Sequence, residues 1–135
     1  MDDAISPTMS PWRRFLDHGD RGELAFQRDP ANGAALFPPR LVAPSGAEDP
    51  PWAVSAGLGT VHSTTCVRAK DGDRNVALVD MDEGFRLLSR VEGVAADRVR
   101  IGQRVRVRWG RDGAEPYPVF DPIEDERADA PGGAP

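Results

Sequence analysis

The sequence lacks the features that would indicate a membrane or secreted protein. Its 135 residues include a single cysteine, Cys66, so no disulfide can form within the chain and nothing indicates an oxidising compartment. No apolar run is long enough to span a membrane. The N-terminus, MDDAISPTMS, has neither the basic start nor the apolar run of a signal peptide. Together these absences predict a cytoplasmic protein without a membrane partner.

Motifs for catalysis are also absent: there is no P-loop, glycine-rich phosphate loop or nucleophile elbow. Period-two spacing in a predicted strand places His62, Thr64 and Cys66 on one face. Four residues of strand span roughly 13 Å, too far for direct proton transfer, so we favour a core role for Cys66. The acidic residues within 80–83 indicate a solvated turn rather than a metal site. We therefore predict that the chain is not an enzyme.

Prolines and glycines are plentiful and unevenly spread. Most of the 13 prolines and 14 glycines fall within residues 1–51 and 110–135. The compact core is therefore expected between about Trp52 and Phe120, a length that fits a small barrel or sandwich. We predict that the tail, residues 124–135, is disordered.

A predicted flexible segment, residues 1–9, precedes a predicted helix at residues 10–22. Ser10 suits the N-cap, and Pro11 suits the first helical position. The apolar side chains of this helix share one face: Trp12, Phe15 and Leu16. A helix this short needs its apolar face to dock, and the sequence leaves open whether it docks on its own chain or on a partner.

The rest of the chain has the pattern of β-strands. A short strand is predicted at residues 23–28, before an irregular, proline-rich stretch. The later strands are predicted at residues 52–69, 74–81, 85–93, 104–110 and 117–123. Glycines indicate a bulge or bend in the first of these five, and prolines make the last an edge strand. Five such strands suit an OB-type barrel, although an SH3-like barrel or a small sandwich would give a similar pattern.

An arginine-rich strand raises the question of nucleic-acid binding. Arg104, Arg106 and Arg108 alternate along one strand face, which is a plausible contact for single-stranded nucleic acid on an OB barrel. However, Trp109 points to the other face, so no aromatic stacking platform accompanies the arginines. The net charge of -5 also weakens this interpretation. We favour a solvated face, or a surface for an acidic partner or phosphate-bearing ligand, and keep nucleic-acid binding as the alternative.

Five segments together resemble a known protein family. They are FPPR, GTVHSTTCV, ALVDMDEGFRLLSRVEG, RIGQRVRVRW and PYPVFDP, in this order. The family pairs an N-terminal helix and a rubredoxin-like zinc ribbon with a C-terminal OB fold, and the resemblance runs from about Pro11 to Pro122. It implies a mainly β chain with a ribbon segment at residues 23–51 and a five-stranded OB-fold barrel at residues 52–123.

The resemblance also implies a function. Members of this family accompany thiolase-like proteins or MaoC-like hydratases in lipid metabolism, and help to hold or guide acyl-CoA. We therefore expect a non-catalytic accessory subunit of an acyl-CoA-processing complex. The expected partner interface consists of Trp12, Phe15, Leu16 and Phe37. The expected contacts to the phosphates of coenzyme A are Arg40, Arg104, Arg106 and Arg108.

The ribbon implied by the resemblance is degenerate. The family's two CxxC pairs fall on Asp29 and Asn32 and on Ala43 and Gly46, so no thiolate remains. A structural zinc site needs four suitable ligands, and we therefore predict that no zinc is bound and that no cofactor binds tightly. Turn formation by Asp29 and Asn32, and packing around Phe37, are expected to replace the metal, together with contacts to the barrel or a partner.

Overall fold

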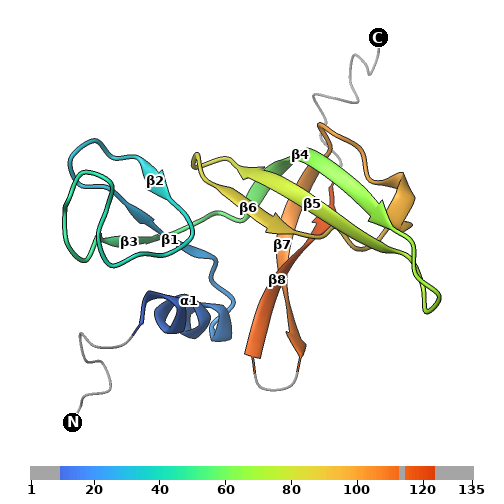
Figure 1. Cartoon of the computed structure of the whole chain (residues 1–135), viewed down its shortest axis with the longest axis horizontal. Helices are drawn as coiled ribbons and strands as arrows, with labels where there is room; N and C mark the ends of the chain where they lie inside the picture. The colour runs from blue at the N-terminus through green and yellow to red at the C-terminus, as the bar shows by residue number, and fades with distance from the viewer. Residues whose placement is uncertain (1–9, 113–114, 124–135) are drawn as a thin grey trace.

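The computed structural model describes residues 10–112 and 115–123, which form one helix and two β-sheets (Figure 1). The predicted flexible segment 1–9 and the predicted disordered tail 124–135 lie outside the described residues. No helix in the described part of the chain is long and apolar enough to cross a membrane. The helix and a small sheet come first along the chain, and a five-stranded sheet follows.

The smaller sheet has three antiparallel strands with β1 (Ala25–Arg28) in the centre. Its neighbours are β2 (Ala35–Leu36) and β3 (Trp52–Val54). The short strand expected near residues 23–28 is thus present. The prediction of one continuous strand over residues 52–69 is wrong, because its first residues pair with β1 and the strand is interrupted before the barrel begins.

The larger sheet is antiparallel, with strand order β6-β5-β4-β7-β8. Its strands are β4 (Leu58–Val67), β5 (Arg74–Met81), β6 (Arg86–Ser89), β7 (Arg104–Asp112) and β8 (Glu115–Pro122). A short 3-10 helix at Ala96–Arg98 lies between β6 and β7. A parallel bridge between Val91 and Phe120 brings the two ends of the sheet together. The predicted mainly β chain, with an N-terminal helix and a five-stranded OB-type barrel, is confirmed.

A β-bulge in β4 changes which side chains share a face. The pairing of β4 with β5 shifts by one residue between Val61 and Ser63, so His62 is the extra residue. His62 is exposed, whereas Thr64 and Cys66 are half-buried. The prediction that His62, Thr64 and Cys66 share one face is therefore wrong, because the bulge reverses the alternation that follows it.

Helix α1 (Pro11–Asp20) docks on its own chain, against β1 and β8. It begins as predicted, with the Ser10 hydroxyl accepting a hydrogen bond of 3.0 Å from the backbone N–H of Arg13. Close to its C-terminus, Gly19 packs against the indole ring of Trp109, so closely that a Cβ atom on this residue would lie 2.7 Å from the ring. The glycine is required here because the helix and β7 approach each other at this point.

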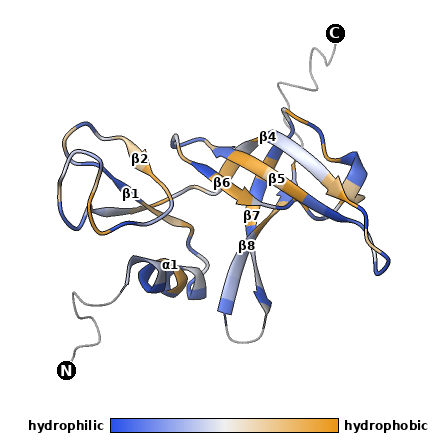
Figure 2. Ribbon diagram, in the orientation of Figure 1, coloured by the Kyte–Doolittle hydropathy of each residue, from blue (hydrophilic) through white to orange (hydrophobic). Residues whose placement is uncertain are grey.

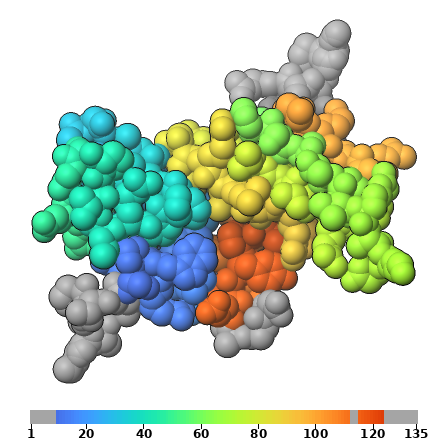
Figure 3. Space-filling model, viewed as in Figure 1, coloured from blue at the N-terminus to red at the C-terminus, as the bar shows by residue number. Residues whose placement is uncertain are grey.

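One apolar core joins the helix, the small sheet and the barrel. Phe26 of β1 stacks on Phe85 at 4.7 Å between ring centroids, and Phe37 contacts both Phe85 and Phe15. Apolar residues concentrate along β5 and β6 (Figure 2). In the space-filling view the small sheet abuts the barrel, and the helix lies beside β8 (Figure 3). The proline-rich stretch is thus held in place partly by Phe37, as the sequence predicts.

Candidate functional site

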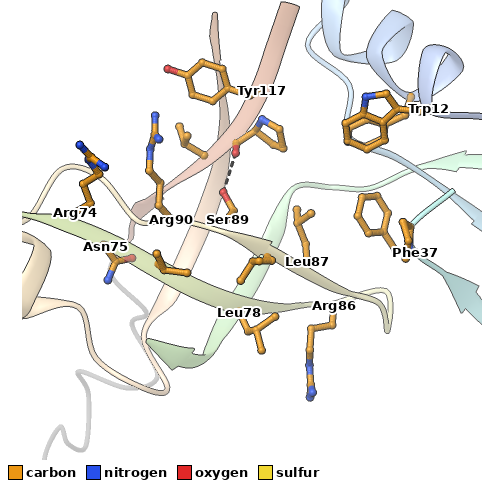
Figure 4. A pocket seen from close by; sticks show the side chains of 16 residues that line it. Trp12, Phe37, Arg74, Asn75, Leu78, Arg86, Leu87, Ser89, Arg90 and Tyr117 are labelled. Carbon is orange, nitrogen blue, oxygen red and sulfur yellow. Dashed lines mark hydrogen bonds between the residues drawn. The ribbon is translucent and has the colours of Figure 1, made fainter. Parts of the chain in front are cut away.

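The described residues form an apolar groove of about 780 Å³. It lies where α1 and the Phe37–Pro38 segment face β5, β6 and β8. Figure 4 shows Trp12 and Phe37 near one end and Arg74 near the other. A volume of this size is within the usual range for binding clefts. This groove is therefore the candidate functional site.

Large apolar side chains remain exposed around the groove. Leu88 is 65% exposed, Trp12 is 51% exposed and Val76 is 37% exposed, and all three line it.

 Tyr117 of β8 also lines the groove and is half-buried. A contiguous set of exposed apolar side chains beside a groove is typical of a surface that binds another molecule.

The charged groups at the rim are already paired within the chain. The Arg86 guanidinium donates to Asp80 at 2.6 Å, and this hydrogen bond holds the pKa of the Asp80 carboxyl below its usual range. Arg90 donates to Glu92 at 2.7 Å, and its guanidinium lies 5.0 Å from the centroid of the Tyr117 ring. The rim therefore adds little uncompensated charge, and the groove suits an apolar occupant.

Two of the arginines predicted to contact coenzyme A are engaged by carboxylates. Arg104 donates to both oxygens of Asp82, at 2.8 and 2.9 Å. Arg108 donates to both oxygens of Asp121, at 2.7 and 3.0 Å, and to Glu92 at 2.8 Å. These hydrogen bonds lower the pKa values of the Asp82 and Asp121 carboxyls. An incoming phosphate would compete with these pairs for the same donors.

The other two predicted arginines differ from these. Arg106 is exposed on β7. Arg40 is half-buried after β2, where its backbone N–H and C=O both bond to the side chain of Gln27 at 2.8 Å. The Arg40 Nε atom is buried without a hydrogen-bond partner. None of the four predicted arginines lines the groove, so the structure does not unite them with the candidate site.

Of the four positions expected for zinc ligands, only Asp29 has a carboxylate, and this carboxylate accepts hydrogen bonds within the chain. Asp29 is 2% exposed, and its Oδ1 accepts hydrogen bonds from the Ser45 hydroxyl at 2.6 Å and the Ala31 N–H at 3.0 Å. Its Oδ2 accepts from the Ser45 N–H at 3.2 Å. The Ser45 hydroxyl, above all, lowers the pKa of the Asp29 carboxyl. Asp29 thus joins the two loops that a metal would join in a zinc ribbon.

The remaining positions do not fit a zinc ion. The side-chain oxygen of Asn32 accepts from the Ala34 N–H at 2.9 Å, and Ala43 and Gly46 have no side-chain ligand atom. Residues 10–112 and 115–123 contain no group of three or more His, Cys, Asp or Glu side chains that could hold a metal ion. The absence of bound zinc stays a prediction, which metal analysis can test.

The predicted partner interface divides into exposed and buried residues. Trp12 is exposed, and Phe37 is half-buried in the wall of the groove. Phe15 and Leu16 are 0% and 3% exposed, so they belong to the chain's own core and are not available to a partner. The helical spacing identified the apolar face correctly, but could not show that most of it is covered by the barrel.

Sequence analysis missed most of the residues that line the groove, among them Val76, Leu88 and Tyr117. Val76 and Leu88 are outward-facing apolar residues in strands whose positions were predicted. In both strands, apolar residues occupy consecutive positions, so they lie on both faces of the strand. Such a pattern could have indicated a covered outer face.

Comparison with known families bears on the second part of the chain. Residues 52–110 match the family model described as the C-terminal OB-fold domain of ChsH2. This match agrees with the barrel, and it confirms the predicted resemblance to a family with a C-terminal OB fold. No curated protein sequence matches the chain.

Two solved structures are similar to this chain over most of its length. A chain of the structure named Ltp2-ChsH2(DUF35) aldolase is 27% identical with a TM-score of 0.74, covering 87% of this chain and 97% of that chain. A DUF35-family protein of unknown function from Sulfolobus solfataricus is 12% identical with a TM-score of 0.64, covering 87% and 89%. The second likeness shows the fold alone.

The first of these structures corrects one prediction. We predicted that the chain is not an enzyme, and this is contradicted because the similar structure is named an aldolase. Motif searches detect only active sites whose residues recur at fixed spacing in one sequence. The absence of such motifs is therefore a poor test of whether a chain takes part in a catalytic assembly.

Proposed function

Because residues 52–110 match the model of the C-terminal OB-fold domain of ChsH2, we propose that this chain is an accessory subunit of a lipid-metabolism complex. Its partner is a thiolase-like chain that acts on acyl-CoA. The observation that carries the proposal is the likeness to the Ltp2-ChsH2(DUF35) aldolase, which extends over 97% of that chain rather than the barrel alone. A likeness of fold by itself would not indicate a partner.

The groove supports the proposal as a surface for the partner. The exposed side chains of Trp12, Val76 and Leu88 line the groove. Covering this apolar surface with a partner would remove it from water, which is favourable. A tryptophan next to a cleft is typical of residues that contribute strongly to protein–protein binding. The partner interface is therefore centred on Trp12 and Leu88, with Phe37 in its wall.

A role in holding or guiding acyl-CoA is the finer part of the proposal. Arg106 is its strongest candidate, because it is exposed and no other described residue forms an ion pair with it. Arg104 and Arg108 are held by carboxylates on either side of it along the same strand. A CoA phosphate would therefore meet Arg106 first and the paired arginines only after their carboxylates move away.

Nucleic-acid binding is less well supported. The arginine face of β7 is partly neutralised by Asp82, Glu92 and Asp121, and sequence-independent binding depends on free cationic side chains that release counterions. No aromatic side chain of the described residues stacks beside these arginines. Salt-dependent gel shifts with single-stranded oligonucleotides would favour this alternative.

Co-expression with the thiolase-like chain encoded nearest to this one tests the proposal. We expect one stable complex on size-exclusion chromatography with light scattering, and weaker association when Trp12 is replaced by alanine. Ile101→Ala is the matched control, because Ile101 is also exposed but lies away from the groove. Recovery of both chains as separate monomers would contradict the proposal, and a complex formed only with a MaoC-like hydratase would change the partner.

A further inference from the structure

One edge of β6 is open, and this edge faces the groove. β6 pairs with β5 in antiparallel register, so successive residues direct their backbone N–H and C=O groups alternately to β5 and away from it. The Phe85 carbonyl accepts from the Met81 N–H at 2.8 Å, which places Leu87 on the paired side as well. The backbone groups of Arg86 and Leu88 therefore point to the opposite edge.

Strand β8 forms backbone hydrogen bonds along this edge only beyond the end of β6. The Arg90 carbonyl accepts from the Phe120 N–H at 3.0 Å, and the Glu92 N–H donates to the Phe120 carbonyl at 2.7 Å. The same ladder, continued by two residues, would need the N–H of residue 118 to donate to the Leu88 carbonyl. Residue 118 is a proline and has no N–H, so the ladder ends there.

The side chain of Ser89 marks the end of the ladder. Its hydroxyl donates to the Pro118 carbonyl at 2.7 Å, which occupies the acceptor on β8 (Figure 4). No backbone hydrogen bond between the described residues of β8 and the stretch 86–88 is present. The open N–H and C=O groups of Leu88 thus lie at a groove with apolar walls.

We propose that the open edge of β6 receives an extended apolar segment of the partner chain as an added strand. Main-chain hydrogen bonds to Leu88 would supply affinity, and the pockets beside Trp12 and Phe37 would select apolar side chains. The inference rests on the proposed function for the identity of the partner. It adds how that partner is held and which residue of this chain pairs with it.

A peptide segment fits the edge better than an acyl chain does. An acyl chain would cover the groove but would leave the N–H and C=O of Leu88 without partners, and buried unpaired polar groups are costly. The segment is expected to be uncharged at its centre, because Arg86 and Arg90 are already paired with Asp80 and Glu92. A charged side chain in the groove would have to break one of these pairs.

The test compares Leu88→Pro with Leu88→Ala in the full chain. Leu88→Pro removes the outward N–H, whereas Leu88→Ala keeps it and removes only the exposed side chain. We expect Leu88→Pro to weaken binding of the purified thiolase-like chain by about 10- to 100-fold. Leu88→Ala should weaken it less, and Ile101→Ala should leave it unchanged. Thermal unfolding of each free variant checks that the fold is intact.

A second measurement uses the unmodified chain, so the test stands even where Leu88→Pro does not fold. Amide hydrogen exchange should show the Leu88 N–H unprotected in the free chain and protected in the complex, while the Leu87 N–H is protected in both. A complex in which the Leu88 amide stays unprotected overturns the inference and leaves the proposed function standing. Absence of any complex overturns the proposed function itself. Protection of Leu88 in a homodimer of the free chain also overturns the inference, because the occupant is then a second copy.

Discussion

The two sheets of this molecule bury different kinds of side chain. In the barrel the buried positions are occupied mainly by apolar residues such as Val79, Val105 and Phe120, none of them exposed. In the small sheet and its loops, Gln27 and Asp29 are 1% and 2% exposed, and each hydrogen-bonds to a loop distant in sequence. The small sheet buries Phe26 in the common apolar core, whereas its loops are fixed by these polar side chains.

This difference separates two ways of stabilising a structure. Apolar burial in the barrel depends on area and on close packing, and it involves many strands at once. The polar contacts of Gln27 and Asp29 are few and directional, and each connects particular backbone groups. Changes in the barrel should therefore act on the whole chain, and changes in the small sheet should act locally.

The largest effect is expected for Phe120→Ala. Phe120 has no exposed area and closes the barrel beside Val91, so the substitution leaves a cavity. We expect the free energy of unfolding to fall by about 3–5 kcal/mol, measured by urea denaturation. Ile101→Ala, at an exposed site, is the control and should change it by less than about 0.5 kcal/mol. A small, local effect of Phe120→Ala would remove the contrast between the two sheets.

Gly19→Ala should have the next largest effect. The new methyl group would lie 2.7 Å from the Trp109 ring, so the helix or the indole must move. Overpacking of this kind costs about 1–3 kcal/mol, although alanine is otherwise the better helix former. Thermal unfolding measures the loss. Increased stability would show that the contact between α1 and the barrel is loose.

Asp29→Asn should act mainly on the loops around the small sheet. It removes the charge that strengthens the hydrogen bonds from Ala31 and Ser45, while keeping the shape of the side chain. We expect the amide hydrogens of Ala31 and Ser45 to exchange about tenfold faster, with the amides of the barrel unchanged. Equal acceleration throughout the chain would show that the small sheet is not an independent unit.

Acid should open the same loops through the same carboxyl. The folded pKa of Asp29 lies below its ordinary value near 3.8, so its contribution to stability is complete above that value and is lost as the pH falls through the folded pKa. The protection of the Ser45 amide, measured as its exchange rate relative to the intrinsic rate at each pH, should fall in this window as the pH is lowered from 5. In Asp29→Asn this pH-dependent loss of protection should be absent. The carboxyls of Asp82 and Asp121 also have lowered pKa values, so acid should weaken their ion pairs in the barrel as well. These ion pairs are present in Asp29→Asn too, so any effect of their loss should be the same in both proteins.

No effect is expected on adding or removing zinc. Chain produced with added zinc should contain no stoichiometric metal by elemental analysis, and a chelator should leave its melting temperature unchanged. Both results follow because the carboxylate of Asp29 is engaged by Ser45 and the other expected ligand positions lack suitable atoms. One zinc ion per chain would show that the loops are held by a metal after all.

Local sequence signals predicted local structure well. Ser10 and Pro11 marked the start of α1, and the alternation of apolar residues located β5 and β7 to within a few residues. The same signals failed at β3 and at His62, where pairing partners rather than propensity decide the structure. Trp52 begins a stretch with the composition of a barrel strand, but it pairs with β1 of the small sheet instead.

The candidate site was harder to predict than the fold. Trp12 and Phe37 were identified from their positions in the sequence, but Phe15, on the same helix face, is covered by Trp109 and Phe37. The predicted CoA arginines were identified by charge alone, which does not show that Asp82 and Asp121 pair with two of them. Burial and ion pairing depend on residues distant in sequence.

The sequence by itself determined the start of the helix, the positions of β5 and β7, and the loss of every thiolate from the expected metal positions. Each of these depends on neighbouring residues or on residue identity alone. Only the tertiary structure decided that Asp29 reaches Ser45, that the apolar face of α1 is covered by the barrel, and that Pro118 leaves the edge of β6 open. These depend on which backbone and side-chain groups folding brings within a few ångströms of each other, and local propensity does not specify that.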